Sequence, residues 1–275
     1  MFSFEGKKAI VTGAGRGIGR ATALAFARQG ADVTLAARTT SELEAVADEI
    51  RQLGRHAWVV QTDIGDLDQA QGLIHQAKQG MGRVDILVNN AGGGSSIPEG
   101  VGPLEQTTPE AFDAVYALNV RSPFFASLQA AQYMKEQGSG GNILNIVSID
   151  GVFPAPGEGL YGSAKAAFVS LTQTLAIELG TYNIRVNAIA PSLIDTKLVS
   201  RYLRTDEQRM DRSSYFPINR VGTPEDIAAA AVYLCSGEAE WVSGVTLLIA
   251  GGQQATSDIF RWVRRVNSVP EGARI

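Results

Sequence analysis

The chain has 275 residues, of which 45% are hydrophobic and 19% charged, and its formal net charge is −4. These values favour a single large α/β domain with an extensive core, and the acidic balance argues against a nucleic-acid partner. One cysteine, Cys235, excludes an intrachain disulfide framework, and two histidines, His56 and His75, are too few for a His-rich metal site, so no metal is expected.

The first eight residues lack the apolar core of a signal peptide. The longest apolar run, residues 227–235, is far shorter than the ~18 residues that span a bilayer. A cytoplasmic protein with no membrane partner is therefore expected.

Short runs rich in Val and Ile alternate along the chain with longer segments of helical period, the pattern of repeated βαβ units. The expected strands are 8–12, 33–37, 57–61, 85–89, 142–147, 185–190 and 246–250. The expected helices are 17–29, 41–53, 67–80, 109–136, 159–180 and 224–235. Seven such strands predict one doubly wound parallel sheet with helices on both faces.

Two helix starts carry capping signals. Ser41 followed by Glu44 is a capping-box pattern, and Pro224 with Glu225 and Asp226 suits a first helical turn.

Two segments do not follow the alternation of strands and helices. Residues 193–222 form a polar insertion, expected to be a mobile lid with a short helix, and residues 253–275 form a C-terminal extension.

A glycine-rich turn follows the first predicted strand, with glycines at 13, 15, 17 and 19. A strand, a tight turn and a helix start of this kind let backbone N–H groups and the helix dipole meet a pyrophosphate. Glycine-rich turns also arise for steric reasons alone. The turn by itself therefore leaves two readings, a phosphate site and a purely structural turn.

Polar residues follow the later strands as well. Asp63 comes after the third strand, residues 89–92 after the fourth, Ser148 after the fifth, and residues 191–196 after the sixth. Each is an ordinary turn residue when taken singly. Because ligands of open parallel sheets lie across the carboxyl ends of the strands, these turns are predicted to share one rim with the glycine turn.

Tyr161 and Lys165 stand four residues apart on a predicted helix and so share one face. An ammonium beside a phenol stabilises the phenolate, so Lys165 is expected to lower the pKa of Tyr161 from its usual value near ~10. Ser148 is expected to reach the same substrate oxygen. Asn119 lies inside a predicted helix, where an amide is a liability unless its side chain or a bound water is used. The alternative is that the Tyr and Lys merely decorate a helix surface.

These residues resemble the short-chain dehydrogenases/reductases over about residues 5–252. The motifs that carry the likeness are Thr12-Gly13-x-x-x-Gly17-x-Gly19, Asn89-Asn90-Ala91-Gly92, Asn119, Ser148, Tyr161-x-x-x-Lys165, and the segment from Pro191 to Thr196. The resemblance implies a Rossmann-like dinucleotide-binding domain over residues 1–252. It also implies hydride transfer between a nicotinamide cofactor and a carbonyl or secondary alcohol.

The same resemblance implies roles for four residues. Tyr161 is the general acid/base, and Lys165 lowers its pKa and holds the nicotinamide ribose. Ser148 orients the substrate oxygen, and Asn119 supports a proton relay through water. A homotetramer, formed through the helices expected at 109–136 and 159–180, is also implied.

The cofactor is expected to be NADP, with NAD as the alternative. An NAD site generally ends its second strand with an acid, but here that end reads Ala37-Arg38, and Asp32 lies at the other end. Arg16 and Arg38 offer guanidinium groups to a 2′-phosphate, unless both are solvated surface residues. The expected cofactor-binding set is Gly13, Gly15, Arg16, Gly17, Ile18, Gly19, Arg38, Asp63, Ile64, Asn90, Ala91, Gly92, Tyr161, Lys165, Pro191, Ile194 and Thr196.

Two positions depart from the family pattern. Ser192 follows Pro191, where the family usually has glycine, and so adds a side chain near the expected nicotinamide. Asp150 occupies a loop position that is more often small and uncharged. It is expected either to cap the local turn or to bind a polar substrate group.

A sizeable apolar substrate is expected from the residues that flank the predicted cleft, namely Val152, Phe153, Leu193 and Leu198, with Asp150 as a polar contact. Residues 89–94, 235–236 and 241–244 are similar to bacterial bile-acid hydroxysteroid dehydrogenases. The alternative enzyme is a reductase of 3-oxoacyl or enoyl thioesters of coenzyme A. The arginines 261, 264 and 265 beside Phe260 and Trp262 would suit that substrate, unless they form a subunit contact.

Two rivals belong to other classes. A catalytically idle NADP-binding sensor or scaffold typically loses the acid/base that this chain keeps. A nucleotide-dependent methyltransferase has no use for Tyr161 and Lys165.

Overall fold

The Val- and Ile-rich runs form seven parallel strands, because apolar residues on both faces let a strand be buried between two helix layers. The computed structural model describes residues 2–200 and 203–256. The strands are β1 (Lys8–Thr12), β2 (Asp32–Ala37), β3 (Ala57–Gln61), β4 (Ile86–Asn89), β5 (Gly141–Ile146), β6 (Ile184–Pro191) and β7 (Thr246–Ile249). Their order is β3-β2-β1-β4-β5-β6-β7, which confirms the predicted doubly wound sheet.

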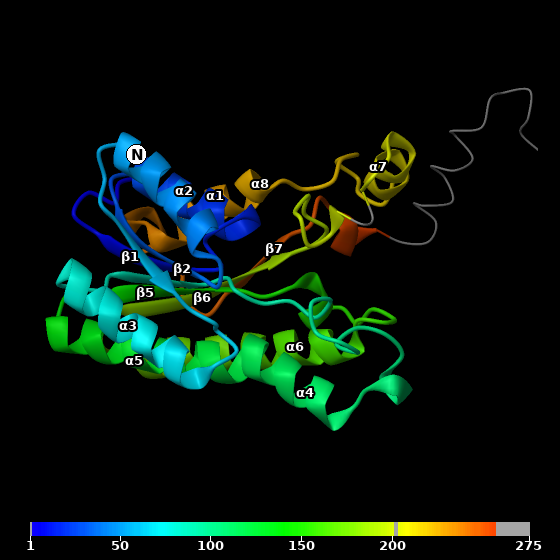
Figure 1. Cartoon of the computed structure of the whole chain (residues 1–275), viewed down its shortest axis with the longest axis horizontal. Helices are drawn as coiled ribbons and strands as arrows, with labels where there is room; N and C mark the ends of the chain where they lie inside the picture. The colour runs from blue at the N-terminus through cyan, green and yellow to red at the C-terminus, as the bar shows by residue number, and fades with distance from the viewer. Residues whose placement is uncertain (1, 201–202, 257–275) are drawn as a thin grey trace, which may run out of the picture.

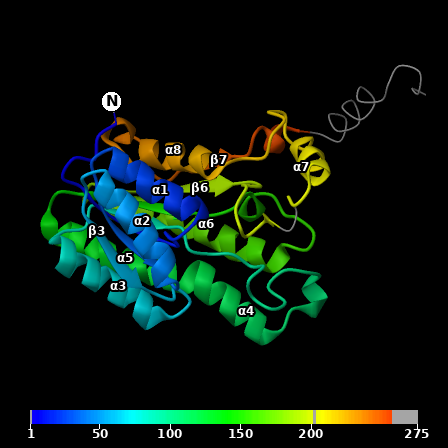
Figure 2. The ribbon, with the colours of Figure 1, turned by 45° about the horizontal axis from the view of Figure 1, so that its top comes forward.

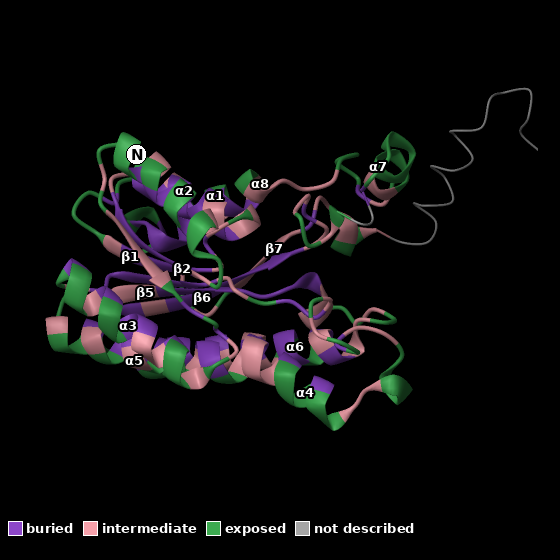
Figure 3. Ribbon diagram, in the orientation of Figure 1, coloured by how far each residue is buried: buried purple, intermediate pink, exposed green. Residues whose placement is uncertain are grey.

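Helices cover both faces of this sheet (Figure 1). The helices α1 (Gly17–Arg28), α2 (Thr40–Gln52) and α8 (Pro224–Cys235) lie on one face, and α3 (Leu67–Met81), α5 (Ser122–Gln137) and α6 (Gly159–Gly180) lie on the other. Figure 2 shows the first layer in front of the strands. One apolar cluster joins α1, α2 and α8 to the sheet and a second joins α3, α5 and α6 (Figure 3), so the core has two layers.

The helix expected at 109–136 is not continuous. It consists of α4 (Pro109–Tyr116), the π-helical turn η2 (Ala117–Arg121) and α5. Pro123 has no N–H to offer the carbonyl of Asn119 four residues earlier, so the α-helical bonding pattern cannot continue through this point. A widened turn of this kind is often found at functional sites, and here it contains Asn119.

One of the two predicted caps is wrong. Thr39, with extended backbone, precedes α2, so Ser41 already lies inside the helix, and no side chain caps this end. The start of α8 at Pro224 is confirmed. There Thr223 and Asp226 form a reciprocal capping box.

The insertion between β6 and α8 contains the expected short helix, α7 (Asp206–Ser213). Its base is closed by a bridge between Ile194 and Gly222. Beyond β7 a short turn, Gln253–Ala255, ends the described residues. The aromatic and arginine residues of the tail lie outside them. No helix within residues 2–200 and 203–256 is both long and apolar enough to cross a membrane.

Candidate active site

The sheet order reverses between β1 and β4, and the turns that follow the strands converge at this place. A methyl group of Thr196, after β6, lies 3.2 Å from where a Cβ of Gly17 would stand. Leu198 similarly approaches Gly93, which lies after β4. The structure therefore brings the glycine turn, the loop after β4 and the segment after β6 together, as the sequence predicted.

The turn between β1 and α1 requires glycine at several positions. Gly13 and Gly17 have φ angles of 66° and 55°, in the left-handed region. A Cβ on Gly19 would lie 2.2 Å from the carbonyl oxygen of Gly13. Arg16, the N-cap residue of α1, makes no side-chain capping bond to the first turn. This cradle, with its helix N-terminus, fits the pyrophosphate of a dinucleotide.

Asn90 and Thr12 join the ends of β4 and β1. The amide of Asn90 donates to the carbonyl of Thr12 at 2.8 Å. The Thr12 hydroxyl accepts from the N–H groups of Asn90 and Ala91, each at 3.0 Å. Asn90 thus holds the glycine turn against the loop that contains Ala91 and Gly92.

Asn119 is buried in η2, and its side chain is fully engaged by backbone. Its Oδ1 accepts from the N–H of Gly93 at 3.0 Å, and its Nδ2 donates to the carbonyls of Gly93 and Val115. A Cβ on Gly92 would lie 2.8 Å from this Oδ1 and 3.0 Å from Nζ of Lys165. Asn119 therefore fixes the loop that faces Lys165.

Tyr161 and Lys165 project from the first turns of α6. The Lys165 side chain is only 3% exposed, and its Nζ donates to the carbonyl of Ile146 at 2.9 Å. The same Nζ lies 5.7 Å from the centre of the Tyr161 ring. Because Lys165 is buried and bonded to the backbone of β5, the alternative of a solvated surface pair is excluded.

Burial governs the ionisation of this pair, and here one expectation is wrong. Burial raises the pKa of Tyr161, the hydrogen bond with Ser148 opposes this, and the negative charges of Asp150 and Glu158 raise the pKa further. Burial also lowers the pKa of Lys165 to about 8. The expected depression of the Tyr161 pKa by Lys165 is therefore not found, because loss of water outweighs an ammonium at this distance.

Ser148 follows β5 and forms a close pair with Asp150. Its hydroxyl donates to Oδ2 of Asp150 at 2.9 Å, and its Oγ accepts from the backbone N–H of Asp150 at 3.2 Å. Burial raises the pKa of Asp150, while these hydrogen bonds oppose the shift. The residue that caps this turn is therefore Ser148 and not Asp150 as one alternative expected, and the Asp150 carboxylate accepts a hydrogen bond from the Ser148 hydroxyl.

The remaining residues of the expected cofactor set occupy mixed settings. Arg38 is exposed after β2, and its guanidinium makes no hydrogen bond or ion pair with the residues described. Arg16 lies 3.4 Å from Glu42. Asp63 is exposed and accepts from the N–H of Gly65. The side chains of Ile64 and Ile194 are buried in the two apolar clusters, so they present only backbone to a ligand.

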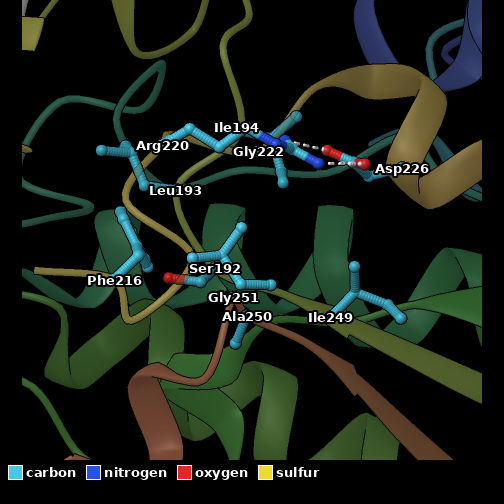
Figure 4. Close-up of a pocket in the computed structure, with 11 residues that line it drawn as sticks. Ser192, Leu193, Ile194, Phe216, Arg220, Gly222, Asp226, Ile249, Ala250 and Gly251 are labelled. Carbon is cyan, nitrogen blue, oxygen red and sulfur yellow. Dashed lines mark hydrogen bonds and ion pairs between the residues drawn. The ribbon is translucent and has the colours of Figure 1, made fainter. Parts of the chain in front are cut away.

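Pro191 ends β6, and the next residue is tied to the chain after β7. The Ser192 hydroxyl donates to Oε1 of Gln253. A cavity of about 160 Å³ lies beside this contact, lined in part by Leu193 and Phe216, with the Arg220–Asp226 ion pair at its edge (Figure 4). Tyr161 and Ser148 are not among the residues that line this cavity.

The expected substrate residues stand around the rim. Val152, Phe153 and Leu198 are 40–50% exposed. Leu193 lines the cavity described above, and the other three residues do not. Their exposure leaves an apolar surface beside Ser148 and Tyr161.

A buried polar chain beneath the site escaped the sequence analysis. Asn89 donates to Ser127 and to Asn145, and Asn145 donates to Thr172, which links β4 and β5 to α5 and α6. A polar residue inside each of two apolar strands was the available signal. Glu42, which lies against the glycine turn, was missed because its sequence position suggests only a helix surface.

Comparisons with known proteins agree with this geometry. A family model described as enoyl-(acyl carrier protein) reductase matches residues 13–254. The 7alpha-hydroxysteroid dehydrogenase of Escherichia coli K12 is 42% identical over 250 residues, covering 90% of this chain and 94% of that protein.

Two solved structures are similar throughout. A 7α-hydroxysteroid dehydrogenase in complex with NADH and 7-oxoglycochenodeoxycholic acid has a TM-score of 0.85 at 40% identity, covering 91% of this chain and 95% of that one. A dehydrogenase from Beutenbergia cavernae with bound NADP has a TM-score of 0.85 at 34% identity, covering 93% of this chain and 99% of that one.

Proposed function

The chain belongs to the short-chain dehydrogenase/reductase family and is an oxidoreductase that uses a nicotinamide cofactor, and from this premise we propose its particular reaction. It transfers a hydride between NADP(H) and a carbonyl or secondary alcohol on a fairly bulky apolar substrate. The observation that carries the proposal is the convergence of Tyr161, Lys165 and Ser148 at the rim beside the glycine cradle.

Tyr161 is the proposed acid/base. Because its pKa is raised, the phenol keeps its proton near neutral pH, and a protonated phenol is the form that donates to a carbonyl oxygen during reduction. Ser148, which interacts with the same phenol, holds the substrate oxygen. When bound, the nicotinamide supplies or accepts the hydride.

Lys165 and Asn119 are proposed to support this step. Lys165 is held in place by Ile146, close to Gly92, and its Nζ is positioned to donate to the ribose of the cofactor. With a pKa near 8 it exchanges protons readily at neutral pH. Asn119 keeps the loop after β4 in register with Lys165, and a proton relay through water at this place remains the family-based proposal.

The preference for NADP rests on two cations. Arg38 has an unpaired guanidinium beyond β2, among the residues described, and Arg16 has only a long ion pair. A guanidinium binds a phosphate through two parallel hydrogen bonds. We expect Arg38→Asp to lose the preference for NADP over NAD, measured as the ratio of the two kcat/KM values. An unchanged ratio would show that Arg38 does not bind the 2′-phosphate of NADP.

A hydroxysteroid-like ketone is the proposed substrate class. It is supported by the exposed apolar residues Val152, Phe153 and Leu198 beside the reacting centre, and by the similarity to a 7alpha-hydroxysteroid dehydrogenase. The second candidate is a thioester reductase, which the description of the matching family favours. A panel of steroid ketones, smaller ketones and acyl-CoA thioesters, followed by NADPH absorbance, separates the two. Reduction of thioesters alone would overturn the ketone proposal.

A homo-oligomer is proposed, with a tetramer as the form that the resemblance implies. Its support is a set of exposed apolar side chains on the outer helices, namely Phe112, Phe125, Leu128 and Ile177. Light scattering gives the mass directly, and a monomer at micromolar concentration would contradict the proposal. A cytoplasmic location remains part of the same proposal.

A further inference from the structure

Glu42 is an acidic side chain that lies against the glycine turn. It belongs to the first turn of α2, and a Cβ on Gly15 would stand 3.0 Å from the Cβ of Glu42 and 3.2 Å from its Oε2. Its other oxygen, Oε1, lies 3.4 Å from Nη1 of Arg16. The carboxylate is therefore held at the edge of the cradle, between the turn and the end of β2.

Other acids on α2 have different partners. Glu44 pairs with Arg51 on its own helix, and Glu49 binds Arg20 of α1 through both of its oxygens. The acid of β2, Asp32, is bound at the far end of the strand by Lys8 and Arg55. A single carboxylate thus approaches the cradle from α2, although β2 itself ends without an acid.

We propose that Glu42 sets the balance between the two nicotinamide dinucleotides. Its carboxylate accepts a hydrogen bond from the ribose 2′-hydroxyl of NAD, the task that an acid at the end of the second strand performs in other dinucleotide sites. The same carboxylate forms an ion pair with Arg16, which competes with binding of Arg16 to the 2′-phosphate of NADP, and its negative charge repels that phosphate. Glu42 consequently opposes Arg38, and the chain accepts both cofactors.

The Glu42 side chain is 34% exposed and Arg16 is 55% exposed, so their ion pair is weak and easily exchanged. The 2′-phosphate of NADP can therefore replace Glu42 as the partner of Arg16, and this exchange lowers the affinity for NADP by roughly fivefold. This inference rests on the proposed cofactor site but not on the identity of the substrate.

The role of Glu42 can be tested without a turnover assay by measuring the binding of four probes by calorimetry. The probes are NADP⁺, NAD⁺, 2′,5′-ADP and 5′-ADP. We expect Glu42→Gln to tighten NADP⁺ and 2′,5′-ADP by roughly fivefold and to weaken NAD⁺, so that the ratio of the two dinucleotide affinities rises. Glu44→Gln removes the same charge from the same helix away from the turn and serves as the matched control. Thermal melting checks that both variants are folded.

Each outcome is decisive. If Glu42→Gln leaves the ratio of NADP⁺ to NAD⁺ affinity unchanged, or if Glu44→Gln shifts it equally, Glu42 does not set the balance. That result leaves the proposed function standing as long as the wild-type protein binds dinucleotides. If the wild-type protein binds neither dinucleotide, the proposed function falls and this inference falls with it.

Discussion

Ionisable groups are neutralised by partners at the end of the sheet where the strands begin, but not at the end where the strands finish. Where the strands begin, Asp32 accepts hydrogen bonds from Lys8, Arg55 and the backbone N–H of His56. Burial alone would raise the pKa of Asp32, but these hydrogen bonds and charges hold it below the usual value. The acid is therefore stable as a carboxylate.

Where the strands finish, the ionisable groups lack such neutralisation. Burial lowers the pKa of Lys165 and raises those of Tyr161 and Asp150. Each shift favours the uncharged form of its group. Groups with pKa values shifted by burial cluster at functional sites, whereas a fully paired acid such as Asp32 stabilises the fold. On this basis the end that carries Tyr161 and Lys165 is the proposed chemical end of the sheet, and the end that carries Asp32 is the structural end.

Lys165→Met should change both the stability and the turnover of the protein. Below pH 8 the fold must keep a buried ammonium, and this penalty is relieved as pH rises from about 8 to the unfolded value of about 10.4. The Lys165 contribution to the wild-type unfolding free energy should therefore rise by about 3 kcal/mol across that window, and the variant should lack this rise. Its turnover should fall roughly 10²-fold.

Urea unfolding between pH 7 and 10 measures the stability of both proteins, with Lys135→Met at an exposed site as the control. A parallel pH dependence in wild type and Lys165→Met would mean that the buried ammonium carries no such penalty.

Asp32→Asn tests the structural end. Removing this partner leaves Lys8 and Arg55 without their shared acid, and we expect a loss of about 2 kcal/mol in unfolding free energy. Because the pKa of Asp32 is depressed in the fold, its contribution is present above the unfolded pKa and disappears as pH falls; the variant should lose less stability in acid. Denaturant unfolding at pH 7 and in acid measures both effects.

Asp48→Asn, an exposed acid on α2, is the matched control for Asp32→Asn. Dinucleotide affinity should be the same in both variants. Loss of dinucleotide binding in Asp32→Asn alone would contradict the conclusion that Asp32 serves only the stability of the fold.

Asp150→Asn tests the pairing of Ser148 with Asp150, and we expect it to change kcat/KM for reduction by a few-fold. As pH rises through the raised pKa of Asp150, its carboxylate draws the proton of Ser148 away from the substrate oxygen. The kcat/KM for reduction should therefore decrease in wild type as pH rises through the raised pKa of Asp150, and it should stay constant over the same pH range in the variant. Glu158→Gln, which removes a charge that acts on Tyr161 without holding Ser148, should keep the wild-type profile. Identical profiles in all three proteins would contradict the role of Asp150.

Much of the fold followed from local pattern. Each strand end lies within one residue of its predicted place, because a strand buried on both faces is a continuous apolar run bounded by turn residues. The interruption of the long helix at Asn119 was missed, although Pro123 was a visible signal for it. The cap at Ser41 failed because the backbone enters the helix one residue earlier.

The grouping of the candidate residues followed from the sequence, but their pKa shifts did not. Spacing alone placed Tyr161 and Lys165 on one helix face and Ser148 at the rim. The direction of the Tyr161 pKa shift depends on how much water the folded chain excludes, which no spacing reveals. The contact of Glu42 with the glycine turn likewise depends on how α2 packs across the end of β2.

Transfer of a deuterium label tests whether Tyr161 supports hydride transfer from NADPH to a ketone. NADPH deuterated at the transferred position is mixed with the steroid ketone that the panel shows to react fastest, and the product is examined by mass spectrometry. We predict label on the carbinol carbon with wild-type protein, and turnover lower by roughly 10²–10⁴-fold in Tyr161→Phe with unchanged NADPH affinity. Tyr182→Phe, at an exposed tyrosine, should match wild type. Undiminished label transfer in Tyr161→Phe would contradict the account.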